Sequence, residues 1–196
     1  MIAVTTLTSY MYCPRKLYLE RVLGISEIPK EAVVRGSIKH RVLDEFNGAE
    51  CSVVCSIVKS ASFEQVFDSY KICFSDILRR VIIKSRNQIN MTGVSPAVLF
   101  NEFSSFFEKE AESRAQFISD FMKKHVLHGE QLWDKLSPKI KSEYKITSET
   151  LGISGKIDRI EIYEGSLVPV ELKTGTPPDE GAWESHKVQL AAYSLL

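Results

Sequence analysis

The sequence predicts a mixed α/β protein, and three observations lead to that fold class. Apolar residues recur every three or four positions over Phe63–Ile82, which indicates a helix with one buried face. The pattern changes after Pro138, where segments of alternating or β-branched apolar residues predict strands. These expected strands are 142–147, 153–163 and 167–173. A final helix is expected to begin near Trp183.

Helices are also expected in the first half of the chain. One spans 8–23 and ends at Gly24, and Pro14 lies where a first helical turn tolerates proline. A second spans 31–46 and repeats an apolar residue every fourth position. Its expected buried stripe is Val34, Ile38, Val42 and Phe46.

A third, longer helix is expected over 97–127, after the break that Gly93 and Pro96 predict. Residues 60–130 are therefore expected to form a helical subdomain. Residues 51–58 fit a strand or a helix equally well. In the final helix, Val188, Ala192 and Leu195 are the expected apolar stripe.

Length and composition narrow the function classes. The chain has 196 residues, of which 44% are hydrophobic and 26% charged, as in a globular domain. No apolar run reaches the roughly 18 residues that a membrane span needs. The N-terminus has no secretory pattern, and the four cysteines are too sparse for a disulfide framework. We therefore expect a cytoplasmic protein with reduced cysteines.

The charge is balanced overall but not along the chain. The 25 basic and 25 acidic residues give a net charge of zero, which excludes a strongly basic nucleic-acid binder. Seven basic and three acidic residues fall between Cys13 and Arg41. A local basic face is expected there, with DNA contacts assigned to Arg15, Lys16, Arg21, Arg35 and Lys39.

The chemistry-bearing stretch is a predicted hairpin. If Glu164 and Gly165 form a two-residue turn, Tyr163 pairs with Ser166 and Asp158 lies opposite Glu171. Directly opposed residues in an antiparallel pair have Cβ atoms about 4.5–5.5 Å apart on the same face. Two carboxylates so close repel each other unless a cation lies between them.

Hard oxygen ligands of this kind suit Mg²⁺ or Mn²⁺. Lys173 shares a strand face with Glu171 and completes a hydrolytic set, because a lysine beside the metal can position or deprotonate a water. Glu-x-Lys is a common triplet, and Glu143-Tyr144-Lys145 is a second copy. Only the first is followed by a helix that places Gln189 and Tyr193 one turn apart.

Five segments, in this order and spacing, resemble the RecB-like branch of the PD-(D/E)XK nuclease superfamily. Within it they resemble most closely the CRISPR-associated iron–sulfur exonuclease family. The segments are Tyr12–Leu19, Gly36–His40, Gly155–Asp158, Glu171–Gly175 and Gln189–Tyr193. The resemblance implies a restriction-endonuclease-like core with a central mixed sheet flanked by helices. Residues 1–196 would form one nuclease domain, and 60–130 a helical insertion within it.

The resemblance also implies residue roles. His40, Asp158 and Glu171 would hold the metal, helped by the backbone carbonyl of Leu172, although a surface histidine is the simpler interpretation of His40. Lys173 would be catalytic, and Gln189 and Tyr193 would orient the site or contact DNA. The implied activity is metal-dependent DNA exonuclease action, often on single strands, during CRISPR spacer acquisition beside the integrase proteins.

A [4Fe–4S] cluster is a further implication, held by one N-terminal and three C-terminal cysteines. Cys13 occupies the N-terminal place. Cys51, Cys55 and Cys73 lie elsewhere, so only one cluster ligand is expected here. The helix that runs to Leu196 without a polar tail leads us to expect a C-terminally truncated chain.

Two other functions fit the same residues. A non-catalytic DNA-binding or scaffold subunit would use the basic face and keep the nuclease fold. A structure-selective endonuclease would use the same carboxylates on a different DNA substrate. The sequence predicts neither cleavage polarity nor oligomeric state.

Overall fold

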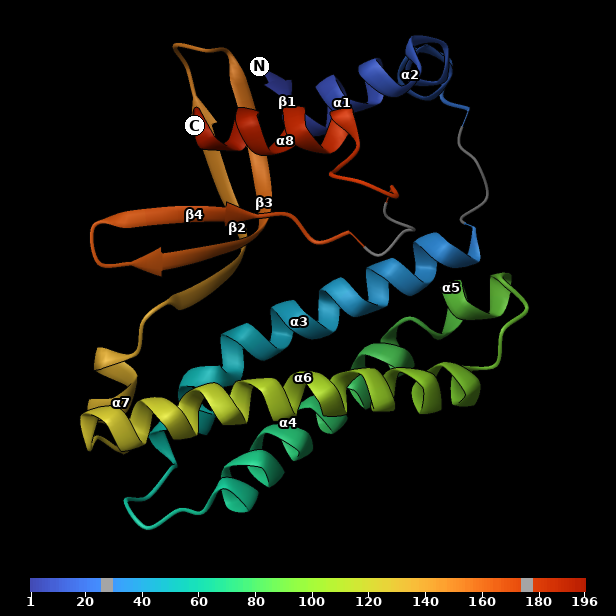
Figure 1. The fold of residues 1–196 in the computed structure, drawn as a ribbon. Helices are drawn as coiled ribbons and strands as arrows, with labels where there is room; N and C mark the ends of the chain where they lie inside the picture. Colours follow the sequence, from blue (N-terminus) through green and yellow to red (C-terminus); the bar gives the residue numbers. More distant parts are fainter. Residues whose placement is uncertain (26–29, 174–177) are drawn as a thin grey trace. The chain divides into compact units, whose positions relative to one another are not determined.

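The computed structural model describes residues 1–25, 30–173 and 178–196, and the chain divides into two units (Figure 1). The first unit comprises Met1–Ile28 and Ile140–Leu196, and the second comprises Pro29–Lys139. The first is mixed α/β and the second is helical, so the predicted α/β class is confirmed. The expected 60–130 segment lies within the helical unit.

The first unit is built on a four-stranded sheet in which β3 pairs with every other strand. Its strands are β1 (Ile2–Ala3), β2 (Lys139–Ser148), β3 (Ile153–Tyr163) and β4 (Ser166–Val170). β1 runs parallel to β3, with Ile2 beside Ile153, whereas β4 runs antiparallel to it. Tyr163 pairs with Ser166, so the predicted hairpin register is confirmed.

Two short helices replace the single helix expected over 8–23. They are α1 (Val4–Tyr12) and α2 (Pro14–Arg21), and the residue between them, Cys13, is extended with φ −164° and ψ 103°. The prediction of one helix was wrong because proline disfavours the helical conformation of the residue before it. Pro14 instead begins α2, where its missing N–H costs nothing.

The helix α8 (Glu184–Ser194) lies beside α1, and both pack near the sheet (Figure 1). Its buried face carries Gln189, Ala192 and Tyr193, whereas Leu195 is 71% exposed. The expected stripe of Val188, Ala192 and Leu195 is therefore wrong for Leu195. Ala192 and Tyr193 join Val4, Ile157 and Ile160 in the core of this unit.

The helical unit contains α3 (Glu31–Cys55), α4 (Phe63–Lys84), α5 (Arg86–Met91), α6 (Pro96–His125) and α7 (Gly129–Lys135). The ambiguous residues 51–58 continue α3 as far as Cys55. The Ser62 hydroxyl accepts a hydrogen bond from the Gln65 backbone N–H, and the Gln65 side chain accepts one from the Ser62 N–H. This reciprocal cap explains why α4 begins at Phe63.

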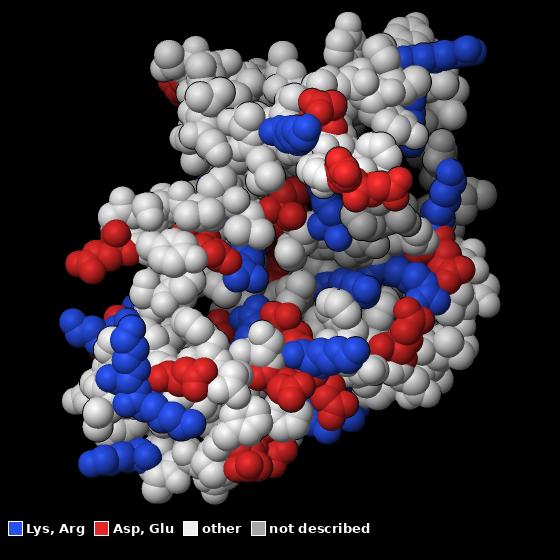
Figure 2. Space-filling view, in the orientation of Figure 1, with Lys and Arg blue, Asp and Glu red and all other residues white. Residues whose placement is uncertain are grey.

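An aromatic core fills the helical unit. Phe46 on α3 stacks on Phe74 of α4 with ring centroids 3.8 Å apart, and Phe74 stacks on Phe107 of α6 at 5.4 Å. The predicted stripe of α3 is buried in full. Basic and acidic side chains intermingle on the face of this unit that Figure 2 displays. None of the described helices has the length and apolarity to cross a membrane.

Candidate active site

Asp158, Glu171 and Lys173 meet where the β3–β4 ladder ends. The last printed pair of that ladder is Arg159 with Val170, so Asp158 and Glu171 are the next residues in the same register. The Asp158 carboxylate accepts a hydrogen bond from the Leu172 backbone N–H at 3.0 Å. This bond keeps the chain after β4 beside β3 although regular pairing has stopped.

Lys173 is oriented by two acceptors. Its ammonium donates to Glu171 Oε1 at 2.8 Å and to Gln189 Oε1 at 2.9 Å. The Lys173 side chain is 39% exposed, whereas the Glu171 side chain is 8% exposed. The amine is therefore held in a fixed position at the edge of the site with access to solvent.

Gln189 and Tyr193 connect the site to α8 and to the sheet. The Gln189 amide nitrogen donates to Glu171 Oε1 at 2.8 Å and to the Tyr193 hydroxyl at 3.2 Å. The Tyr193 hydroxyl donates to the Lys156 carbonyl oxygen on β3 at 3.0 Å. A flipped amide would turn its nitrogen toward the Lys173 ammonium, so the lysine and the carboxylate together fix the orientation of Gln189.

Gly155 makes room for Tyr193. A Cβ atom at this position would lie 2.6 Å from Tyr193 Cε1 and 3.0 Å from Cδ1, and the tyrosine ring is buried. The ring therefore lies directly against the backbone of β3. The run of small residues that precedes Asp158 in the sequence is the signal for this close approach, although the sequence does not identify Tyr193 as the neighbour. The Lys156 carbonyl was missed, because a backbone acceptor leaves no side-chain pattern.

The electrostatic feature of the site is an incompletely paired carboxylate. Burial raises the pKa of Glu171, and the nearby negative charge of Asp158 raises it further, while Lys173 and Gln189 act in the opposite direction. Glu171 Oε1 accepts two hydrogen bonds, but Oε2 is buried and has no hydrogen-bond partner among the described residues. A buried, unpaired carboxylate oxygen is costly unless something else binds it.

This donor set fits one hard divalent cation. Mg²⁺ is usually bound through one or two carboxylates and retains several waters, and Asp158 with the free Glu171 oxygen offers such a pair. No group of three or more His, Cys, Asp or Glu side chains suited to a metal occurs within 1–25, 30–173 and 178–196. Within the α/β unit, the described side chains that suit this cation are the carboxylates of Asp158 and Glu171.

Of the remaining candidate residues, His40 belongs to the other unit of the chain. His40 is half-buried on α3 in the helical unit, so its role as a metal ligand stays a prediction. His186 on α8 has a lowered pKa because it is partly buried and because the Lys173 cation is near. Thr174 and Gly175, the end of the Glu171–Gly175 motif, lie outside the described residues.

The residues assigned to DNA contacts divide into two groups. Arg35 and Lys39 are engaged within the helical unit: Arg35 pairs with Glu31 and Glu102 at 2.6 and 2.5 Å, and Lys39 lies over the Phe106 ring at 4.4 Å. On α2, Lys16 pairs with Glu20 at 3.7 Å. Arg15 and Arg21 are exposed on α2.

The four cysteines are divided between the two units, so neither unit by itself supplies four thiolates. An iron–sulfur cluster needs four ligands, commonly thiolates. Cys13 belongs to the first unit, where its Sγ accepts a hydrogen bond from the Lys16 N–H at 3.4 Å. Cys51 and Cys55 form a pair on α3 with sulfurs 3.8 Å apart, and Cys73 lies on α4.

Comparison with known proteins gives a family match over the full sequence. A family model described as the PD-(D/E)XK nuclease superfamily matches residues 1–196. The CRISPR-associated exonuclease Cas4 of Rhodospirillum rubrum is 40% identical over 53 residues, which cover 26% of this chain and 16% of that protein.

Two fused relatives match as well. A Cas4 exonuclease/Cas1 endonuclease fusion of Leptospira interrogans is 40% identical over 81 residues, or 36% of this chain and 15% of that protein. A fusion of the same name from Myxococcus xanthus is 40% identical over 58 residues, or 28% and 10%. The matched stretches thus span less than a fifth of each of these relatives.

Proposed function

This chain belongs to the PD-(D/E)XK nuclease superfamily, and on that premise we propose that it is a divalent-metal-dependent deoxyribonuclease. Its proposed action is exonucleolytic hydrolysis of phosphodiester bonds in single-stranded DNA during CRISPR spacer acquisition. The names of the similar proteins support the CRISPR setting and an integrase partner. The helical unit is proposed to be an insertion in one nuclease domain.

One observation carries the proposal: Glu171 has a buried oxygen without a partner, beside a second carboxylate and an oriented lysine. Asp158, Glu171, the Leu172 carbonyl and His40 are the proposed ligands of Mg²⁺ or Mn²⁺. A bound ion of this kind neutralises phosphate charge and makes water more acidic.

The chain's own residues have separate proposed tasks. Lys173, held at 2.8 Å from Glu171 and partly exposed, is the catalytic residue that contacts the scissile phosphate or orients the attacking water. Gln189 is a positioning residue, because it fixes both Lys173 and Glu171. Tyr193 in turn holds Gln189 against the sheet.

The exposed face of α2 supports a single-stranded substrate. Arg15, Tyr18 and Arg21 are three residues apart along this helix and all are exposed. Residues at this spacing share one helix face. Basic groups follow a phosphate backbone, and aromatic rings stack on unpaired bases. We therefore assign a strand-binding role to this face.

The test compares two glutamates in the same local sequence. Glu171→Gln removes a carboxylate of the site, whereas Glu143→Gln changes the other Glu-x-Lys triplet, whose glutamate pairs with Lys156. We expect Glu171→Gln to slow Mg²⁺- or Mn²⁺-dependent cleavage of end-labelled single-stranded DNA by about 100-fold or more. Glu143→Gln should stay within about threefold of the unmodified chain, and EDTA should abolish cleavage in both.

A circular single strand separates exonuclease from endonuclease action, because it offers no end. Degradation of the linear strand with an intact circle supports the proposal. Cleavage that persists undiminished in Glu171→Gln would contradict the proposed catalytic site. Steep salt-sensitive binding without any cleavage would replace the proposal with a non-catalytic binding role.

A further inference from the structure

A cavity of about 240 Å³ lies within the helical unit, between α6 and the connection from α3 to α4. Phe63, Met122 and Leu127 contribute apolar walls, Ser119 contributes a hydroxyl, and Lys123 contributes an ammonium group. No acidic residue belongs to its lining. The composition suits a small ligand with a flat apolar part and a negative group.

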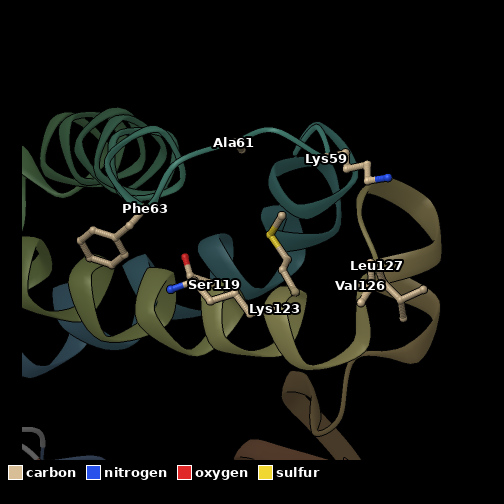
Figure 3. Close-up of a pocket in the computed structure, with 8 residues that line it drawn as sticks. Lys59, Ala61, Phe63, Ser119, Lys123, Val126 and Leu127 are labelled. Atoms are coloured by element: carbon tan, nitrogen blue, oxygen red, sulfur yellow. The ribbon is translucent and has the colours of Figure 1, made fainter.

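The hydroxyl of Ser119 lies in this cavity without a polar partner. Ser119 is 6% exposed, and its Oγ has no hydrogen-bond partner among the described residues. A serine within a helix usually bonds the carbonyl one turn earlier or points to solvent, and this one does neither. Figure 3 shows the hydroxyl directed from α6 toward the segment that carries Ala61.

Lys123 reaches the same place from the next turn. Long side chains on a helix lean toward its N-terminus, so residue i+4 covers residue i. Figure 3 shows the Lys123 side chain extended along α6 toward Ser119. Lys123 is exposed and has no carboxylate partner in the part of the chain that the structure describes. The ammonium and the hydroxyl thus form a paired donor set at the cavity.

The far end of the cavity is held in an unfavourable backbone conformation. Val126, which lines the cavity, ends α6 in the left-handed region with φ 55° and ψ 39°. β-branched residues rarely adopt that conformation, and such outliers concentrate at binding sites. A glycine would adopt the same φ and ψ without steric conflict. The valine at the rim of the cavity therefore marks a strained position of the kind that concentrates at binding sites.

From these features we propose that the cavity binds one nucleoside monophosphate unit. The phosphate is held by Lys123 and the Ser119 hydroxyl, and the base lies against Phe63 and Met122. The size limits the occupant to no more than one unit, because a volume of about 240 Å³ is below the roughly 300 Å³ at which pockets for drug-sized ligands start. This inference rests on the proposed function for its choice of anion, since a deoxyribonuclease meets nucleotides both within strands and as products.

The experiment measures thymidine monophosphate binding to the intact protein by calorimetry in EDTA, so that no metal can recruit the phosphate elsewhere. We expect thymidine, which lacks the phosphate, to bind at least about tenfold more weakly. Lys123→Glu should weaken monophosphate binding by at least about tenfold, and Ser119→Ala by about threefold or more. The control is Lys109→Glu on the same helix, which is exposed outside the cavity and should change nothing.

Absence of binding at millimolar nucleotide, or equal binding by the unmodified chain and Lys123→Glu, overturns the proposal. A Ser119→Ala variant with an unchanged melting temperature keeps the test valid if Lys123→Glu misfolds. A 5′-phosphorylated pentathymidylate distinguishes the sources through its Lys123-dependent binding. A larger loss in Lys123→Glu than for the monophosphate identifies a nucleotide within a strand, and a smaller loss identifies a free product.

The two proposals fail separately. Lys123-dependent nucleotide binding in a protein that cleaves no DNA would remove the proposed function and leave this site. Glu171-dependent cleavage in a protein that binds no thymidine monophosphate would remove the nucleotide site and leave the proposed function.

Discussion

Each unit contains a buried glutamate with a cation and a tyrosine, but the two sets differ in how completely they are closed. In the helical unit Glu50 pairs with Arg114 at 3.1 Å and accepts from the Tyr70 hydroxyl at 3.1 Å, and both charged side chains are at most 10% exposed. In the α/β unit Glu171 keeps a buried oxygen unpaired, and its lysine partner is 39% exposed. The first set is enclosed by protein and the second is left open on one side.

This difference indicates which polar cluster is structural. Arg114 has a second partner, Glu110, at 2.9 Å, and its guanidinium lies over the Phe46 ring at 4.7 Å. Its Nη1 lies 3.1 Å from Glu50 without hydrogen-bond geometry, but this atom is buried, so its surroundings are supplied by the protein. Lys173 and Glu171 satisfy each other only in part. A solvent-accessible amine beside an unpaired carboxylate oxygen is a place where a ligand can still gain interactions.

The largest expected effect is on DNA cleavage, through the open cluster of Glu171, Lys173 and Gln189. Lys173→Ala should reduce single-strand cleavage by about 100- to 10,000-fold, the range of a positioned proton-transfer or charge-stabilising group. The folded state should be retained, because the side chain is partly exposed. Initial rates on labelled DNA and a thermal melt measure the two effects. The matched control is Lys145→Ala on β2, which should preserve the rate.

In the enclosed cluster of Glu50, Arg114 and Tyr70, the expected effect is on the free energy of unfolding and not on cleavage. Arg114→Ala leaves Glu50 buried in an aromatic core without its cation, which costs about 3–5 kcal/mol of unfolding free energy. The double variant Glu50→Leu/Arg114→Met removes both charges and should be less destabilised than the single one. Urea unfolding measures both. A single variant as stable as the unmodified chain would mean that Glu50 is not held by Arg114, and the contrast between the clusters would disappear.

The sequence predicted the register of the β3–β4 hairpin better than it predicted the helices around it. The register that brings Asp158 to Glu171 followed from a two-residue turn, because one turn length determines every pair in a hairpin. The break at Cys13 was missed because apolar periodicity does not register the restriction that Pro14 places on the residue before it. The buried face of α8 was partly mispredicted because its site-facing residue, Gln189, is polar, and apolar periodicity does not identify a buried polar residue.

In the helical unit, the sequence did not predict which distant residues would pair. Glu50 and Arg114 lie on α3 and α6, and nothing in either local sequence specifies a partner so far along the chain. The Ser119 cavity was missed for the same reason, since its lining comes from α6 and from the segment before α4. Periodicity identifies which face of a helix is buried, but not which polar atoms within that face stay unpaired.

Gly155→Ala tests how tightly the open cluster depends on the sheet. The added methyl group would overlap the Tyr193 ring, which is buried and anchored to Lys156 and Gln189, so the ring must shift. Overpacking of this kind costs about 1–3 kcal/mol in stability. We expect cleavage to fall by about tenfold or more, because Gln189 loses its support. Gly48→Ala is the control, because a methyl group there meets open space. Gly165→Ala is unsuitable as a control, because its positive φ would strain an alanine at the turn between β3 and β4.

The smallest predicted effect is a pH dependence in the enclosed cluster. Burial raises the pKa of Tyr70 above its ordinary value near 10, and the negative charge of Glu50 raises it further. The folded chain therefore holds this proton where the unfolded chain releases it, so the stabilising contribution is complete below pH 10 and declines as the pH rises above it. Each such group contributes a slope of about 1.4 kcal/mol per pH unit.

Tyr70→Phe should lower stability by about 1 kcal/mol at pH 8, through loss of the bond to Glu50, and should make the decline from pH 10 to 11 shallower than in the unmodified chain. Tyr163→Phe, which loses an exposed hydroxyl bonded to Glu161, gives the comparison for a tyrosine outside the core. Equal declines in the Tyr70→Phe and unmodified chains would mean that the Tyr70 hydroxyl is reached by solvent, and the helical cluster would then be open in the same sense as the site around Glu171.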